Sequence, residues 1–284
     1  MLTAGGDEAI LMSPLDASSF EGVPLAILAG SPASSRRSRK VAPDGPPLID
    51  LTGALEDVEG ARLRAPSAEP ALPATPSGLQ VIAHPGAIAI AMFLAAVSRT
   101  SAIRRSIIHV FEPASERGQR GVEELQQQTV AVLSFQKVKT DVFDGQLAFN
   151  MLAAYGEEAL EQLDSIEGRL ERHLATLLAA WPGVPMPSLR VIQAPVFHGH
   201  SFSIWTEFEE QTSVDTIKES LNRAGIDVRD EDPPANAQSA GMDGLSVGAI
   251  AKDRNNARAV WFWLVGDNLR LAGANALSVA KEML

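Results

Sequence analysis

Apolar and polar residues follow two clear periods in the last two thirds of the chain. Residues 81–97 are apolar almost throughout, and Pro85 in their midst predicts a buried strand that ends there and leads into a buried helix. Leucine and isoleucine recur at helical spacing from Tyr155 to Trp181, with Gly168 as a weak point inside. Apolar and polar side chains alternate from Ser201 to Glu209, which is typical of a strand covered on one side.

Three further elements complete this part of the chain. Residues 213–224 predict a short amphipathic helix that Gly225 can end. Residues 260–265 are apolar throughout and predict a buried strand, and residues 268–284 predict a terminal helix.

The first 80 residues have a different texture. Short apolar runs at 9–12, 24–28 and 48–51 predict strands of a parallel sheet joined by crossovers. Residues 56–80 are rich in proline, which predicts a loop or linker. The basic cluster at 36–40 favours a solvated loop, with binding of a phosphate or an acidic partner as the alternative.

Composition narrows the class of protein. The 284 residues are 45% hydrophobic, which suffices for a sizeable core in one or two domains. A net charge of −11 argues against a nucleic-acid partner. The absence of cysteine excludes disulfides, thiolate metal sites and a cysteine nucleophile. No secretory signal or membrane helix is expected, and the composition fits a cytoplasmic protein.

Five segments together resemble one enzyme family in their order and spacing. They are VIAHP at 81–85, GVEEL at 121–125, FDGQLAFN at 143–150, APVFHGHS at 194–201 and GDNLR at 266–270. From about residue 15 to the end, the chain is similar to the aspartate-semialdehyde dehydrogenase family, with its NAD-binding and dimerisation domains.

The resemblance implies an α/β fold of two parts. A truncated, Rossmann-like nucleotide-binding domain comprises residues 1–85 and is completed by residues 267–284. A larger α+β dimerisation and catalytic domain with a mixed sheet comprises residues 86–266. The chain starts at about the family's third or fourth strand, so either the first strands are lost or the start site is misassigned.

The resemblance also implies a reaction that this chain lacks the means to perform. The family's enzymes are NADP-dependent, and a cysteine thiolate attacks the aldehyde because it is a strong nucleophile near neutral pH. Ala87 stands at the position of that cysteine, and no other residue of the chain replaces it. His200 matches the family's general-base histidine and is retained, although packing is the expected role for a base without a nucleophile.

Other positions of the family's site are altered too. The arginine that binds the substrate carboxylate corresponds to Gln193, which cannot form a charged bidentate fork. The glutamine near the nucleophile corresponds to Glu112, and the phosphate-binding arginine to Glu56. The loop that approaches the cofactor reads Ser115-Glu116-Arg117-Gly118, where two bulky charged residues replace small ones.

Neither a cofactor nor a metal is expected. The family implies NADP, but the chain has no Gly-x-x-Gly-x-x-Gly turn after a strand to hold the pyrophosphate. His198 and His200 would point to one face of a strand, yet no carboxylate or cysteine partner is identifiable for a metal site.

Two functions remain at this point. The first is a catalytically inactive relative with a dimerisation or partner-binding role, as a homodimer or paired with an active paralogue. The alternative is an NADP-dependent semialdehyde dehydrogenase of aspartate-family amino-acid biosynthesis. A homodimer is predicted to use the strands at 201–209 and 260–265, with Trp205 or Trp263 near the interface. The alternative is a monomer whose long helix covers the sheet.

Overall fold

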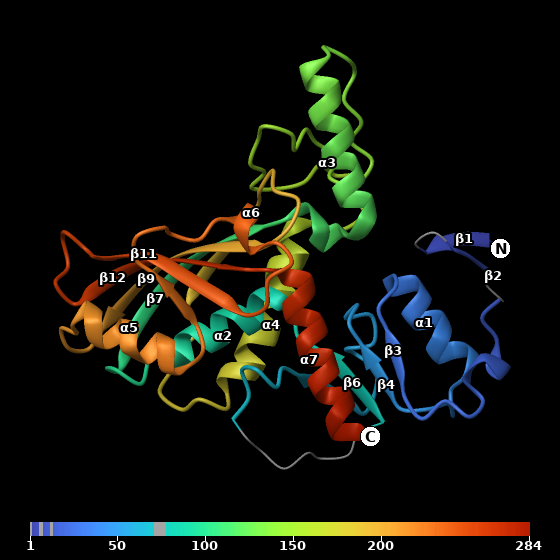
Figure 1. Ribbon diagram of the computed structural model, residues 1–284, viewed down its shortest axis with the longest axis horizontal. Helices are drawn as coiled ribbons and strands as arrows, with labels where there is room; N and C mark the ends of the chain where they lie inside the picture. The colour runs from blue at the N-terminus through green and yellow to red at the C-terminus, as the bar shows by residue number, and fades with distance from the viewer. Residues whose placement is uncertain (1, 6–7, 12–13, 71–77) are drawn as a thin grey trace. The chain divides into compact units, whose positions relative to one another are not determined.

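The computed structural model describes residues 2–5, 8–11, 14–70 and 78–284 of the chain. The chain divides into two compact units, shown in Figure 1. The domain boundaries expected from the sequence stay a prediction. The smaller unit comprises Met1–Arg64, Pro73–Ile82 and Ala276–Leu284, and the larger comprises Ala65–Leu72 and Ala83–Asn275.

The smaller unit contains a four-stranded parallel sheet. Its strand order is β3-β4-β6-β5, and every neighbouring pair runs parallel. Leu28, Leu48, Leu55 and Leu79 form its buried core. The runs at 24–28 and 48–51 are thus confirmed as parallel strands. The strands are β3 (Ala26–Leu28), β4 (Leu48–Asp50), β5 (Ala61–Arg64) and β6 (Leu79–Ile82).

The first apolar run does not join this sheet. β2 (Glu8–Leu11) pairs in antiparallel fashion with β1 (Leu2–Gly5) in a separate two-stranded ribbon, so its expected place in a parallel sheet is wrong. Met12, the last residue of the run, lies outside the described residues. A one-turn 3-10 helix, η1 (Ala17–Phe20), follows.

Two loop predictions for this part of the chain are also wrong. The basic cluster lies in a helix, α1 (Pro32–Val41), because Ser31 and Ser34 form a capping box and proline occupies the first turn. The proline-rich linker contains β5 and the beginning of β6. β5 forms because it lies at the edge of the sheet and ends before the first proline. Residues 71–77 of the predicted linker lie outside the described residues.

The larger unit contains a mixed six-stranded sheet of order β10-β11-β12-β9-β7-β8. The outermost pair on each side runs parallel, and the three central pairs are antiparallel. Both sheets match the α/β architecture expected from the sequence. The strands are β7 (Ile103–Glu112), β8 (Ser188–Gln193), β9 (His200–Phe208), β10 (Asp227–Arg229), β11 (Leu245–Lys252) and β12 (Ala259–Gly266).

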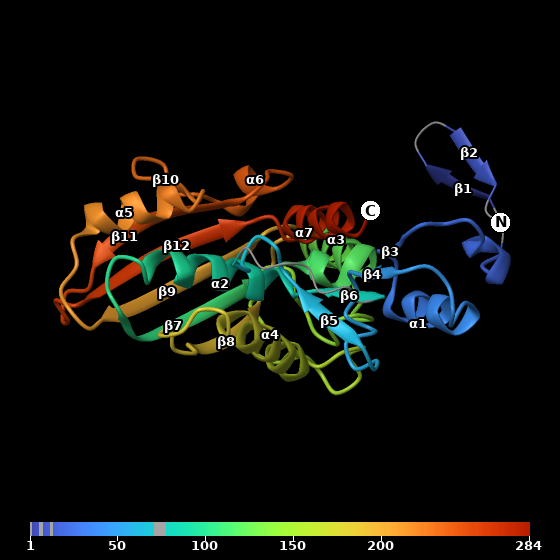
Figure 2. The same cartoon turned by 90° about the horizontal axis from the view of Figure 1, so that it is seen from below.

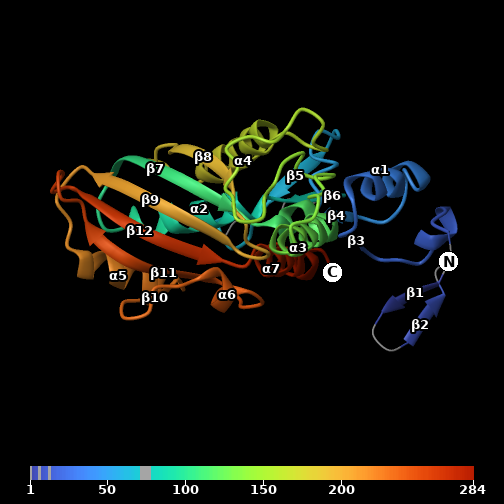
Figure 3. The ribbon, with the colours of Figure 1, turned by 90° about the horizontal axis from the view of Figure 1, so that it is seen from above.

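Three helices cover one face of this sheet, which we call the inner face. They are α2 (Pro85–Val97), α4 (Leu163–Leu178) and α5 (Val214–Arg223), which lie below the strands in Figure 1 and in front of them in Figure 2. On the inner face, Phe93 of α2 meets Phe262 of β12 edge to face, with ring centroids 4.9 Å apart. The opposite, outer face of the sheet is turned toward the viewer in Figure 3.

Most predicted elements of this unit are confirmed. The alternation at 201–209 places Phe202, Ile204, Thr206 and Phe208 on the buried inner face. The helix predicted from Tyr155 begins only at Leu163, however. The preceding segment is held as a loop by Asp144, which accepts a hydrogen bond from the Glu158 amide at 3.0 Å. Tertiary contacts thus override the helical pattern there.

Two of the segments that carry the family resemblance, GVEEL and FDGQLAFN, lie in a projecting arm. α3 (Gly118–Leu133) stands out from the sheet in Figure 1, and the chain returns along it. Gln128 of α3 is fully buried, and its carboxamide oxygen accepts hydrogen bonds from the Leu147 and Ala148 amides. Glu124 accepts a hydrogen bond from the Val142 amide at 2.6 Å. Polar residues of α3 therefore shape the FDGQLAFN segment.

The chain ends in α7 (Asn268–Met283), which confirms the predicted terminal helix. Two short helices, η2 (Ala114–Arg117) and α6 (Asn236–Ser239), lie in loops at the same end of the larger sheet. Across the described ranges, none of the helices has the length and apolar character needed to span a membrane.

Candidate active-site region

The register of the larger sheet brings three of the predicted site residues to one edge. Glu112 is the last residue of β7 and pairs with Gln193, the last residue of β8. His200 is the first residue of β9, and its neighbour Ser201 pairs with Phe111. Side chains alternate along a strand, so Glu112 and His200 share the inner face with Val110 and Phe202.

A second histidine, not singled out from the sequence, joins them from a helix start. His84 follows β6 and is the N-cap of α2, where its Nδ1 accepts a hydrogen bond from the Gly86 amide at 3.1 Å. Its backbone amide donates to His173 Nδ1 at 2.9 Å. These two bonds fix the ring of His84 against the sheet edge. A polar residue within an otherwise apolar run was the one sign of it in the sequence.

The side chains of Glu112, Glu116 and the two histidines form a buried cluster. His84 Nε2 lies 4.0 Å from Glu112 Oε2 and 3.8 Å from Glu116 Oε2. His200 Nδ1 lies 3.9 Å from Glu116 Oε1, and the two imidazole rings are 5.7 Å apart. His84, Glu112 and His200 are 5%, 0% and 1% exposed, so water does not screen these charges.

One buried arginine partly neutralises the cluster. Arg117 donates a hydrogen bond to Glu112 Oε1 at 2.6 Å and pairs with Glu161 through its other terminal nitrogen. Burial opposes the charge of Arg117, but the Glu112 and Glu161 carboxylates raise its pKa, and it stays protonated. Arg169 lies 3.8 Å from Glu161 on the other side.

Burial shifts the titration of the acids and bases in opposite directions. It raises the pKa of Glu112 and of Glu116 above the ordinary value, against the attraction of Arg117. It lowers the pKa of His84 well below its ordinary value and that of His200 to about 4. Both imidazoles are therefore neutral at physiological pH.

Ala87, which is predicted from the sequence to stand at the position of the family's nucleophile, carries no reactive atom. Ala87 lies in the first turn of α2, three residues after the His84 cap, and is fully buried. Its methyl group packs in the core. The nearby serine, Ser115, donates its hydroxyl proton to Asn268 Oδ1 at 3.1 Å.

Gln193 is engaged entirely by the protein. Its amide nitrogen donates to the Glu112 carbonyl at 2.8 Å and to the Ala194 carbonyl at 3.1 Å. Its carboxamide oxygen accepts the hydroxyl proton of Tyr155 at 2.6 Å. The side chain therefore holds the ends of β7 and β8 together and presents no donor to a ligand.

Two other predicted residues do not join the cluster. His198 precedes β9 and is separated from His200 by Gly199 at φ +83°, so the two rings do not share a strand face as expected. Glu56 lies in a turn after β4 in the smaller unit. The expectation that His200 lacks a carboxylate partner is wrong, because Glu112 and Glu116 lie beside it.

Two features of the described residues bear on the dinucleotide that the family resemblance implies. In the smaller unit, the Ser34 amide in the first turn of α1 is already used, because Ser31 Oγ accepts from it at 3.2 Å. Ser34 Oγ accepts from the Ser31 amide in return, at 2.8 Å. In the larger unit, Glu116 and Arg117 turn into the buried cluster instead of leaving a small-residue loop. Neither feature offers free backbone donors to a pyrophosphate.

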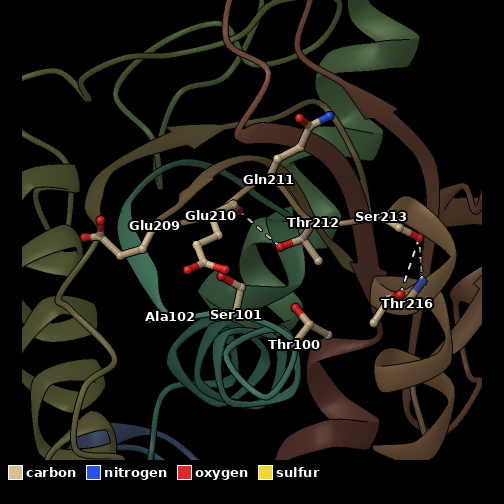
Figure 4. A pocket seen from close by; sticks show the side chains of 9 residues that line it. All are labelled: Thr100, Ser101, Ala102, Glu209, Glu210, Gln211, Thr212, Ser213 and Thr216. Atoms are coloured by element: carbon tan, nitrogen blue, oxygen red, sulfur yellow. Dashed lines mark hydrogen bonds between the residues drawn. The ribbon is translucent and has the colours of Figure 1, made fainter.

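A shallow hollow of the larger unit lies away from this cluster. Figure 4 shows a shallow pocket of about 470 Å³ between residues 100–102, at the end of α2, and residues 209–216, at the start of α5. Ser213 Oγ accepts from the Thr216 amide at 3.2 Å, and Thr212 Oγ1 donates to the Glu210 carbonyl at 3.2 Å. These two hydroxyl groups cap a helix and stabilise a turn, so neither is directed at a ligand in the pocket.

Comparison with known proteins places the chain in a family. The model of the semialdehyde dehydrogenase dimerisation domain matches residues 95–271. The chain belongs to the semialdehyde dehydrogenase family. This confirms the family inferred from the five sequence segments.

Individual relatives agree with that assignment. The chain is 28% identical over 294 residues to an aspartate-semialdehyde dehydrogenase from Prochlorococcus marinus, covering 98% of this chain and 82% of that one. It is 29% identical to a USG-1 protein homolog from Pseudomonas aeruginosa, covering 98% and 84%. A solved structure of a probable aspartate-semialdehyde dehydrogenase from Pseudomonas aeruginosa superposes with a TM-score of 0.82 at 27% identity, covering 99% and 85%.

Proposed function

We propose that this chain is a catalytically silent member of the semialdehyde dehydrogenase family that acts through self-association. The observation that carries the proposal is Ala87. A methyl group in the first turn of α2 cannot attack an aldehyde, and no residue of the chain is a cysteine. His200 remains a neutral base, but the residue from which it would take a proton is missing.

The surroundings support the loss of catalysis. The Gln193 side chain already makes hydrogen bonds to two backbone carbonyls and to the Tyr155 hydroxyl, so it is not available to a substrate carboxylate. The Arg117 guanidinium is already paired with the Glu112 and Glu161 carboxylates. An enzyme needs its charged groups aimed at the substrate, whereas here they neutralise one another.

A turnover assay tests this proposal. Purified protein is given aspartate semialdehyde, phosphate and NADP, and NADPH is followed by absorbance. We expect no turnover above trace, and Ala87→Cys should not restore it because Gln193 still lacks the guanidinium fork. Phosphate-dependent turnover by the unaltered chain would establish the alternative, an active NADP-dependent enzyme of amino-acid biosynthesis. Several relatives carry the name aspartate-semialdehyde dehydrogenase.

The outer face of the larger sheet supports self-association. Ile107, Trp205 and Trp261 stand in one row across β7, β9 and β12. Ile107 and Trp261 are 44% and 39% exposed. Both indole N–H groups donate to Asp253 Oδ2, at 2.9 Å and 2.8 Å, which fixes the rings in place. Rigid, partly exposed tryptophans are typical anchors of protein interfaces.

The projecting arm adds a second apolar surface. α3 and the loop after it present large apolar side chains to solvent, and Phe135 is 98% exposed. A surface of this kind on one arm is typical of a segment that packs on another subunit. Its exposed apolar residues are Val130, Leu133, Phe135, Phe149 and Met151.

We infer a two-fold homodimer in which both surfaces are covered by a second copy of the chain. Closed two-fold dimers are the commonest oligomers, and the matching family model is a dimerisation domain. Light scattering should give twice the chain mass of 30.2 kDa. A mass equal to that of one chain contradicts the dimer. An active paralogue that presents the same face could replace the second copy, and native mass spectrometry after co-expression tests that pairing.

A further inference from the structure

Electron-pair donor atoms of three buried residues converge at one end of the strands of the larger sheet. His84, Glu112 and His200 each offer one nitrogen or carboxylate oxygen, and these atoms lie within 4.8 Å of one another. The residues come from the start of α2, the end of β7 and the start of β9. Their meeting is therefore a product of the tertiary fold and not of one local turn.

Each of the three side chains has an atom left without a partner. Within the part of the chain that the structure describes, His84 Nε2, Glu112 Oε2 and His200 Nε2 are buried and make no hydrogen bond. Native proteins rarely bury a polar atom unpaired, because its lost hydration is not replaced. Three such atoms in one cluster point to a ligand that accepts electron pairs from all of them.

We propose that His84, Glu112 and His200 bind a divalent first-row transition-metal ion such as zinc. Two imidazoles and one carboxylate are a ligand set that suits zinc and its neighbours, whereas calcium and magnesium prefer oxygen ligands alone. Metal binding does not depend on the catalytic silence proposed above.

The charges around the site also favour a cation. Arg117 neutralises one of the two buried carboxylates by pairing with Glu112 Oε1. It leaves Oε2 of Glu112 unpaired and leaves the charge of Glu116 without a hydrogen-bonded cation of its own. Glu116 lies within 4 Å of both imidazoles and adds negative charge beside the site. A divalent ion would offset the carboxylate charge that burial makes costly.

Binding requires two small rearrangements. Ligand atoms of one tetrahedral ion lie roughly 3.4 Å apart at metal-to-ligand distances near 2.1 Å, so the 4.0 Å gap between His84 Nε2 and Glu112 Oε2 must close slightly. Coordination through Nε2 also moves the proton of the His84 ring to Nδ1, which ends its bond to the Gly86 amide. One lost hydrogen bond is small beside the free energy of a zinc site.

Calorimetry tests the proposal directly. Zn²⁺ is titrated into the full chain after chelator treatment and removal of the chelator. We expect one ion per chain with a Kd of about 1 µM or below. The absorption of the Co²⁺-loaded chain should show the ligand-field bands of a low-coordinate nitrogen and oxygen site. A Kd weaker than about 100 µM for the unaltered, folded chain overturns the proposal.

Matched variants locate the ion. His84→Asn keeps a side chain able to cap α2 but removes Nε2, and His200→Asn removes the second imidazole. Each should weaken zinc binding by roughly 100-fold or more. His198→Asn alters the neighbouring histidine that lies outside the cluster and should bind as the unaltered chain does. Unchanged affinity in both His84→Asn and His200→Asn, with folding confirmed by circular dichroism, overturns the assignment even if zinc binds elsewhere.

Discussion

Two glutamates of the larger sheet occupy opposite faces and have opposite surroundings. Both are buried, and both lie on central strands. Glu207 on the outer face is surrounded by arginines whose side chains are 39% to 65% exposed. They are Arg104, Arg105 and Arg258. Glu112 on the inner face has one guanidinium partner, Arg117, whose side chain is only 8% exposed.

The difference teaches how to tell a structural carboxylate from a candidate ligand. Both oxygens of Glu207 are taken by arginines that keep contact with water, so the ion pairs need nothing more. Oε2 of Glu112 has no hydrogen-bond partner among the residues described and faces two neutral imidazoles. Both residues are glutamates. A structural glutamate has a hydrogen-bond partner on each carboxylate oxygen, whereas the candidate ligand has one oxygen without a partner.

The largest effect should come from removing one glutamate from each face. Glu112→Ala leaves Arg117 deeply buried with Glu161 as its remaining acid, so we expect a loss of about 3–5 kcal/mol in the free energy of unfolding. Glu207→Ala should cost much less, because its arginines can turn to water. Urea unfolding of both variants measures the contrast, and equal losses would contradict it.

The free energy of unfolding should depend on pH because His200 is buried. The pKa of His200 is about 4 in the folded chain and ordinary in the unfolded chain, so as pH falls the unfolded state takes up the proton first. Stability should therefore decline from about pH 6.5 to 4, with about 3 kcal/mol from this residue.

His200→Asn isolates that contribution. Glu112 and Glu116 act in the opposite sense, because their raised pKa makes the folded state hold protons longer and lose stability as pH rises. The difference between the unaltered chain and His200→Asn removes this background. Urea unfolding at several pH values, with a chelator present, should show a shallower acid decline for the variant. Parallel curves would mean that His200 is not desolvated.

A smaller effect is expected at the outer face, where Glu207 and its arginines would border the dimer interface. Trp261→Ala should weaken the dimer by about 2 kcal/mol, or roughly 30-fold in Kd. Met242→Ala removes an apolar side chain that is 57% exposed but lies outside the strand row, and it should leave the dimer unchanged. Sedimentation velocity over a concentration series compares the two. Equal weakening would remove the outer face from the interface.

The smallest effect serves as a baseline that touches neither glutamate. A Cβ at Gly168, inside α4, would meet Arg172 Nη1 at an ordinary 3.7 Å and nothing closer. Gly168→Ala should therefore raise the free energy of unfolding by about 0.5–1 kcal/mol through reduced backbone entropy in the unfolded chain. A thermal melt checks this, and a lowered midpoint would show that α4 is packed more tightly than the structure indicates.

The sequence by itself determined the elements whose burial pattern is regular. Three elements were predicted close to their observed bounds: the strands at 201–209 and 260–265 and the helix at 213–224. When one side of an element is buried, apolar residues recur along the sequence with the period of that element. The sequence also indicated the family, which the comparisons confirm. The positions of Ala87, Glu112, Gln193 and His200 in the family's site stay predictions.

Where local pattern and tertiary contact disagreed, the sequence failed. Residues 155–162 have a helical pattern but are held as a loop by Asp144, and β5 forms inside a proline-rich stretch because it is an edge strand. The serine capping box that starts α1 was not recognised from the sequence, where the basic cluster after it favoured a solvated loop.

Only the tertiary structure decided which of the predicted site residues lie together. Glu112 and Gln193 meet because β7 and β8 pair in parallel, and Glu112 meets His200 because β7 and β9 pair in an antiparallel register that places both on the inner face. His84 joins them because α2 starts at that edge. No local pattern encodes these meetings, since they depend on strand register between segments far apart in the chain. Register and burial together bring Glu112, His200 and His84 into one desolvated cluster, which Glu116 joins.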